Sequence, residues 1–240
     1  MVIISSITLA GCNVGDSGGK GAVGIPGPQN SSIATRTYDV GGFTGVTVTG
    51  PDNVTIRRGE RFSVGAAGNS ATLDKLVIRV VEGKLEIGRV RTMLSLGTSI
   101  PAAVRVTLPT LDNLTVVGSG SAQSDTLTGD RSEVSIVGSG DIGITNIETG
   151  RINMTVAGSG NLTAAGQATR VDANTVGSGS IAASRLTTPR ANISGAGAGD
   201  IALNVTEAAE VSTVGSGDVT VTGGGRCTTS SLGSGTIRCR

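Results

Sequence analysis

Three aspartates occupy the same place in a recurring sequence motif, and two of them are candidates for acid–base chemistry. Asp141, Asp200 and Asp218 each lie three residues after the first glycine of a Gly-Ser-Gly or Gly-Ala-Gly tripeptide. Asp200 and Asp218 belong to consecutive repeats, so stacked repeats would hold their carboxylates about 5 Å apart. Retaining glycosidases place their two carboxyl groups at a similar separation. The pattern therefore supports, as one alternative, a polysaccharide-active enzyme that uses Asp200 and Asp218.

The same column also has a structural explanation, which we favour. At the equivalent place the other repeats carry small polar residues, namely Ser121, Asn161, Ser180 and Thr236. Asp, Asn and Ser beside glycine commonly hydrogen-bond the local backbone in turns, and a column that accepts Ser and Thr does not require a carboxylate. We therefore expect a turn ladder here, with a ligand or ion site at Asp141, Asp200 and Asp218 as the lesser alternative.

The composition argues against several functions. The 240 residues include no His, so no Ser of a Gly-Ser-Gly has a triad partner, and the commonest metal ligand is missing. The 19 basic and 18 acidic residues balance, and the aromatic residues are Tyr38, Phe43 and Phe62 alone. Because neither a cationic stripe nor a stacking platform is apparent, we expect no nucleic-acid partner. We also expect no cofactor, no metal and no catalytic residue.

The N-terminal residues carry a targeting signal. Residues 1–11 are apolar or small and end in Leu9-Ala10-Gly11, directly before Cys12. Leu-Ala-Gly-Cys resembles the bacterial lipobox, in which the cysteine is lipidated and becomes the first residue of the mature protein. We predict a lipoprotein signal peptide with its lipobox cysteine at 1–12 and, from the Gly, Pro and Ser content, a flexible tether at 13–34. The protein is then exported to the bacterial cell envelope and lipid-anchored, at the outer membrane or the periplasmic face.

Seven tripeptides divide the rest of the chain into repeats. Gly-Ser-Gly begins at Gly118, Gly138, Gly158, Gly177, Gly215 and Gly233, and Gly-Ala-Gly begins at Gly197, so the spacing is 18 to 20 residues. Four residues before each first glycine the side chain is mostly apolar, between two polar columns, and a second alternating segment follows the glycines. Such alternation predicts short strands with one buried face. A repeat of this length indicates an all-β fold, a right-handed parallel β-helix or β-solenoid with glycine at its corners.

Residues 35–240 are predicted to form one β-helix domain. Residues 35–111 are strand-like but irregular and contain every aromatic residue, so we expect an N-terminal β cap. Residues 112–240 hold the seven coils. In the last coil, Cys227 and Cys239 fall in inward-facing columns, and in an exported chain they are predicted to form a disulfide worth about 3 kcal/mol. A pair of buried free thiols is the alternative.

The order of several motifs resembles a known family. Tyr38-Asp-Val-Gly-Gly-Phe-Thr-Gly-Val-Thr-Val, Leu73-Asp-Lys-Leu, Leu85-Glu-Ile and Val106-Thr-Leu-Pro-Thr-Leu111 precede the Gly-Ser-Gly series. Together they resemble the auto-transporter adhesin head GIN domain family of bacterial envelope proteins, over residues 35–240. The resemblance implies a right-handed β-helix, often on a lipoprotein, and supplies no catalytic residues.

The sequence as a whole predicts a non-enzymatic envelope lipoprotein whose β-helix presents an adhesion, binding or structural surface. The expected partners are the membrane, through the lipid anchor, and an envelope protein or a glycan, while the oligomeric state stays open. The polysaccharide-active enzyme is one alternative. An envelope scaffolding or stress-related module is the other, because a long polar face would serve it equally well.

Overall fold

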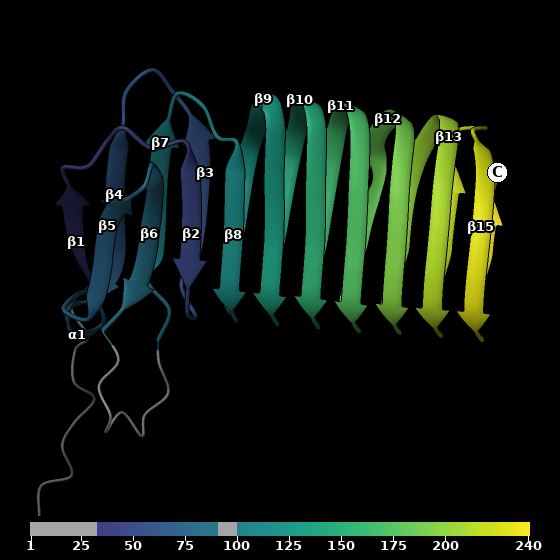
Figure 1. Ribbon diagram of the computed structural model, residues 1–240. Coiled ribbons are helices and arrows are strands. Elements are labelled where there is room, and N and C mark those ends of the chain that lie inside the picture. Colours follow the sequence, from purple (N-terminus) through teal and green to yellow (C-terminus); the bar gives the residue numbers. More distant parts are fainter. Residues whose placement is uncertain (1–32, 91–99) are drawn as a thin grey trace, which may run out of the picture. The chain divides into compact units, whose positions relative to one another are not determined.

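The computed structural model describes residues 33–90 and 100–240. The predicted signal peptide, Cys12 and nearly all of the predicted tether lie outside the described residues. The chain divides into two units, residues 1–31 and 32–240. The second unit is a β-solenoid, as the repeat predicts, and it has about six turns, against the seven coils counted from the glycine tripeptides. In Figure 1 its coils follow one another from the N-terminal strands to β15.

The irregular N-terminal segment is built from seven strands and one helical turn. They are β1 (Ile33–Tyr38), β2 (Gly45–Thr49), β3 (Asn53–Arg58), β4 (Ser63–Asn69), α1 (Ser70–Leu73), β5 (Leu76–Val81), β6 (Lys84–Arg89) and β7 (Ala103–Leu108). β2 and β3 pair in parallel with the first coil, matching Val46 with Leu114 and Val54 with Ala122. The β1–β4, β4–β7 and β5–β6 pairs are antiparallel. The cap thus continues the coil stack on one side and ends it with antiparallel strands on the other.

The regular coils follow in one parallel ladder. Their strands are β8 (Asn113–Gly118), β9 (Ser121–Gly138), β10 (Asp141–Gly158), β11 (Asn161–Gly177), β12 (Ser180–Gly197), β13 (Ile201–Gly215), β14 (Val219–Thr222), β15 (Arg226–Gly233) and β16 (Ile237–Cys239). Each residue pairs with its counterpart one repeat away, as Met154 does with Val134 on one side and Ala173 on the other. Equivalent side chains therefore stand in rows along the solenoid.

The inward rows form one continuous hydrophobic core. Four residues before the corner glycine, Leu114, Val134, Met154 and Ala173 are fully buried. Ile142, Leu162 and Ile181 line the facing layer from the segment that follows the corner. Figure 1 shows these two layers, with the arrowheads of the nearer layer at the corners. Aliphatic side chains fill the thin space between the layers, which explains why the coils need no aromatic residue.

The corner glycines are required because successive corners stack on each other's backbone. Gly158 has φ +128°, and a Cβ built on it would lie 2.2 Å from the carbonyl oxygen of Gly138. A Cβ on Gly160 would lie 2.0 Å from the carbonyl oxygen of Gly140. No side chain fits at such distances, so the sequence period follows from backbone-to-backbone contact between coils.

The two strand segments of a coil are continuous with each other. The alternating columns predict separate short strands, but β9, β10, β11 and β12 run through the bend without interruption. Their ladders remain paired across it, as between Glu148 and Thr128. Glycines with positive φ at Gly129 and Gly166 help the chain bend while it stays hydrogen-bonded to the neighbouring coil.

Candidate binding surface

The aspartate column forms hydrogen bonds between coils. Asp200 Oδ1 accepts a hydrogen bond from the backbone N–H of Asp218 at 2.8 Å, and Asp218 Oδ1 accepts one from the N–H of Thr236, also at 2.8 Å. Asp141 Oδ1 accepts from the N–H of Asn161 at 2.9 Å and from its Nδ2 at 3.1 Å. Each carboxylate therefore bonds to the backbone of the next coil, where the sequence suggested only bonds within its own turn.

The contacts of Asp218 lower its pKa. The N–H of Thr236 and, next, the guanidinium of Arg238, 3.2 Å from Asp218 Oδ2, hold the pKa of this carboxyl below its usual value near 3.8. A general acid needs a raised pKa, so these contacts do not favour Asp218 as the proton donor of a glycosidase pair. The hydrogen bonds between coils favour a structural role for Asp200 and Asp218.

The outer surface of one layer carries four parallel rows of side chains, and we call this surface the striped face. Its rows lie seven, five, three and one residues before the corner glycine, so neighbouring rows are about 6.6 Å apart. The third row holds hydroxyl and amide groups: Thr115, Ser135, Thr155, Asn174, Ser194, Ser212 and Ser230. The register keeps every row aligned from β8 to β15.

The first row of the striped face is an arginine row, which corrects the expectation that the chain has no cationic stripe. It holds Arg131, Arg151, Arg170, Arg190 and Arg226, while Ala208 stands in the coil before the last and Leu111 precedes the first. In the sequence, the row corresponds to the column seven residues before the corner glycine. Acidic residues in the second row and at the bend offset the row's charge.

Ion pairs divide the arginine row into paired and unpaired members. Arg151 Nε lies 2.8 Å and Arg170 Nε 3.6 Å from the same Asp172 carboxylate, and Arg190 Nε lies 3.4 Å from Glu207. Arg131 and Arg226 are exposed and have no ion-pair partner among residues 33–90 and 100–240. The row therefore keeps free positive charge at its two ends.

The fourth row is aliphatic and exposed to solvent. It holds Val117, Val137, Ala157, Val176, Ala196, Val214 and Leu232. The exposed fraction is 46% for Val137, 58% for Val176 and 72% for Leu232. A line of large apolar side chains that leaves the core and faces water is unusual on a free surface and is typical of a contact region.

The opposite layer has a hollow where one coil is shorter than its neighbours. Gly158 and Gly177 are 19 residues apart, against 20 in the coils on either side. The hollow has a volume of about 510 Å³ and is open to solvent. Its lining includes Gln123, Asp141, Gly143, Asn161, Thr163 and Arg185. Asp141 is thus the one candidate aspartate that lies at a concave surface.

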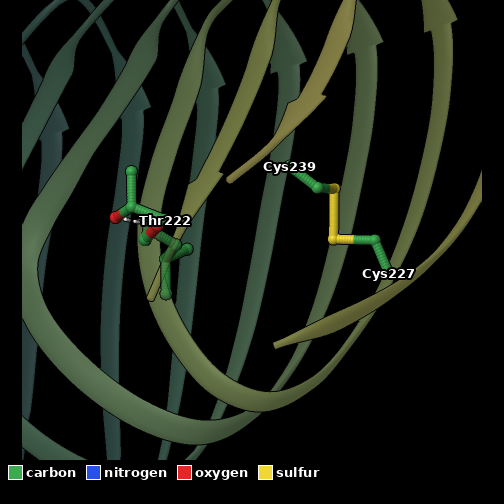
Figure 2. The surroundings of a disulfide bond; sticks show 4 residues. Thr222, Cys227 and Cys239 are labelled. Atoms are coloured by element: carbon green, nitrogen blue, oxygen red, sulfur yellow. Dashed lines mark hydrogen bonds between the residues drawn. A yellow bond between two sulfur atoms is a disulfide. The ribbon is translucent and has the colours of Figure 1, made fainter. Parts of the chain in front are cut away.

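The disulfide predicted at the end of the chain is present. Cys227 in β15 and Cys239 in β16 are bonded, with their Cα atoms 6.6 Å apart, and Figure 2 shows the bond joining the two layers of the last coil. Nearby, Thr222 Oγ1 donates a hydrogen bond to the carbonyl oxygen of Leu203 at 3.3 Å. Among the described residues, no cluster of three or more acidic, histidine or cysteine side chains could hold a metal ion.

The parallel solenoid with stacked glycine corners and aligned outer rows places the chain in the class of β-helical proteins. The chain belongs to the family described as "Putative auto-transporter adhesin, head GIN domain", which matches residues 42–225 and confirms the resemblance noted in the sequence. No curated protein matches the chain. In the described part of the chain no helix has the length and apolar character needed to cross a membrane.

Solved structures share the fold. A "putative adhesin" from Bacteroides fragilis is similar with a TM-score of 0.79 and 21% identity, over 88% of this chain and 98% of that chain. A "putative lipid binding protein" from Parabacteroides distasonis gives a TM-score of 0.69 and 22% identity, over 88% and 98%. A "putative adhesin" from Parabacteroides merdae gives a TM-score of 0.67 and 17% identity, over 88% of this chain and 97% of that chain. At these identities the likeness establishes the fold alone.

Proposed function

We propose that this chain is a non-enzymatic protein of the bacterial cell envelope that is lipid-anchored through Cys12 and contacts an envelope protein or a glycan through its striped face. Family membership supports an exported, adhesin-like protein. The observation that carries the proposal is the aliphatic row, in which Val137, Val176 and Val214 are each about half exposed beside hydroxyl, carboxylate and arginine rows. An apolar line with a polar border is the usual composition of a protein contact region.

The anchor and the contact face are tested separately. Bacteria that express the full chain should incorporate an alkyne-labelled fatty acid into the wild type and not into Cys12→Ser. Adhesion of the same cells to immobilised envelope material should fall at least fivefold for the double variant Val137→Glu, Val176→Glu. The matched control Thr169→Glu, an exposed change at the bend, should adhere like the wild type. Equal adhesion of all three strains would contradict the role of the striped face.

Lipid binding is a second candidate, because the similar protein from Parabacteroides distasonis is described as a lipid-binding protein and the aliphatic row could meet acyl chains. The row is only one residue wide and runs along a flat layer, which favours a protein or glycan contact. Flotation of the Cys12→Ser chain with phosphatidylglycerol vesicles decides between them. Flotation that is lost in Val137→Glu, Val176→Glu supports lipid binding, and no flotation supports the adhesin.

The alternative of a polysaccharide-active enzyme is disfavoured by the bonds of Asp200 and Asp218. Both carboxylates accept backbone hydrogen bonds from the next coil, and Thr236 and Arg238 bond to both oxygens of Asp218. The double variant Asp200→Asn, Asp218→Asn distinguishes an enzyme from a non-enzymatic protein. Cleavage of an envelope polysaccharide by the wild type that disappears in this variant, with folding intact, would establish the enzyme and refute the proposal.

A further inference from the structure

The hollow on the opposite layer originates in a one-residue deletion. In the β10–β11 ladder, Thr145 and Asn146 both stand opposite Ala165. In the β11–β12 ladder, Ala183 and Ser184 stand opposite Ala164. β11 therefore lacks one residue relative to both neighbours at the same height. Two bulges placed back to back interrupt the regular surface, and bulges of this kind are common next to binding sites.

Small residues keep the hollow open. Gly143 and Ala165 lie in its lining, where the equivalent outward residues of the same layer include Gln123 and Thr163. A Cβ on Gly143 would lie 2.1 Å from Oε1 of Gln123. The Gln123 side chain therefore reaches over the glycine into the hollow. A larger residue at position 143 would displace this amide, so the glycine sets the depth of the hollow.

The polar groups around the hollow remain available for a ligand. Gln123, Thr163 and Arg185 are exposed and make no side-chain hydrogen bond or ion pair within the described part of the chain. Asp141 bonds to Asn161 through Oδ1 alone, which leaves Oδ2 available. Asp218, in contrast, uses both oxygens, one with Thr236 and the other with Arg238. The hollow thus gathers unused donors and acceptors.

We propose that this hollow binds an acidic sugar unit of a glycan, with the sugar carboxylate at Arg185 and the sugar hydroxyls at Asp141, Asn161 and Gln123. A guanidinium binds a carboxylate through two parallel hydrogen bonds. Carboxylate and amide side chains accept from and donate to hydroxyl groups. The lining offers no aromatic platform and is more polar than apolar, which disfavours a nucleobase or a hydrophobic peptide side chain. The open shape admits an internal unit of a polymer. This site lies on the opposite layer and goes beyond the contact face proposed above.

Titration of the full-length chain with oligogalacturonate, a uronic-acid polymer, tests the site by calorimetry. The wild type should bind, and Arg185→Gln and Asp141→Asn should each lower the affinity at least tenfold with unchanged thermal unfolding. Arg61→Gln removes an exposed arginine of the cap, outside both the hollow and the striped face, and is the matched control for charge, so it should bind like the wild type. Neutral cello-oligosaccharide should bind at least tenfold more weakly than oligogalacturonate.

Other outcomes overturn the inference. Equal losses of affinity in Arg185→Gln and Arg61→Gln would show that only overall charge attracts the polymer. Tighter binding of a poly-glutamate peptide would identify a protein ligand instead of a sugar. No binding of oligogalacturonate to the folded wild type would reject the acidic-sugar site. Cells that carry Arg185→Gln should still adhere through the striped face, so failure of the hollow and failure of the proposed function remain distinguishable.

Discussion

Asp52 and Arg89 form a buried ion pair within the cap. The Asp52 side chain is fully buried, and its carboxylate accepts a hydrogen bond from Arg89 Nε at 2.9 Å and another from the N–H of Ala102 at 2.8 Å. Arg89 also donates to the carbonyl oxygen of Ile100 at 2.8 Å. The pair therefore connects the turn after β2, the end of β6 and the segment before β7.

Removal of this arginine should destabilise the fold strongly. Arg89→Met leaves the Asp52 carboxylate buried without its cation, and breaking a buried pair in this way costs about 3–5 kcal/mol. The matched control is Asp74→Asn, which breaks the exposed Arg36–Asp74 pair and should cost less than about 1 kcal/mol. Urea unfolding measures both changes. A similar decrease in the free energy of unfolding in the two variants would show that the burial of Asp52 does not determine the cost of breaking its ion pair.

Stacked corners should not tolerate a methyl group. In Gly160→Ala the added Cβ would lie 2.0 Å from the carbonyl oxygen of Gly140, so two coils must separate, and we expect a loss of about 3 kcal/mol. Gly65→Ala is the control, since its Cβ would meet nothing closer than 3.7 Å. That change should be neutral or stabilise by about 0.5 kcal/mol. Thermal unfolding with equal midpoints for the two variants would contradict the stacking argument.

The disulfide should hold the last coil closed. Cys227→Ser, Cys239→Ser opens a loop with a sequence separation of 12, which costs about 3 kcal/mol if the effect is mainly chain entropy. The loss should be local, so hydrogen exchange should accelerate in β15 and β16 and remain slow in β10. Ser230→Ala, an exposed change in the same coil, provides the control. Unchanged exchange in β15 would show that its pairing with β13 suffices.

The pH dependence of stability should include a contribution from Asp218. Because its folded pKa lies below the usual value near 3.8, its bonds stabilise the fold fully above that pH and are lost as the pH falls through the folded pKa. Asp218→Asn should therefore be less stable than the wild type at pH 7 and equally stable near pH 2. Glu60→Gln, at an exposed carboxylate, should leave the pH profile unchanged. Urea unfolding across this range makes the comparison.

Sequence reasoning recovered the features that repeat in every coil. The columns containing Met154 and Ile142 predicted inward-facing strands, and both residues are buried. The cysteine columns predicted the bond between Cys227 and Cys239. These predictions are confirmed because parallel stacking places equivalent residues of successive coils side by side. A column in the aligned repeats therefore corresponds to a row of side chains in the structure.

Sequence reasoning did not predict the features that arise where the repeat is irregular or absent. The hollow arises because β11 is one residue short, and the 19-residue spacing showed this without revealing which side chains border the gap. The pairing of Asp52 with Arg89 joins irregular segments for which no repeat gives a register. The arginine row could have been found, because Arg131 and Arg151 stand at the same offset from their glycines. That offset lies further from the glycines than the columns that predict the buried strand face.

The parallel ladder determines how the solenoid responds to tension along the chain. Each coil from β9 to β13 is hydrogen-bonded only to the coil before it and the coil after it. Tension applied to the end of the chain would therefore peel off the outermost coil while the others stay folded. The disulfide would shorten the first step, because the segment from Cys227 to Cys239 cannot extend. Each later step would release 18 to 20 residues, or roughly 60–70 Å of extended chain. The solenoid would therefore lengthen under load in steps of nearly equal length.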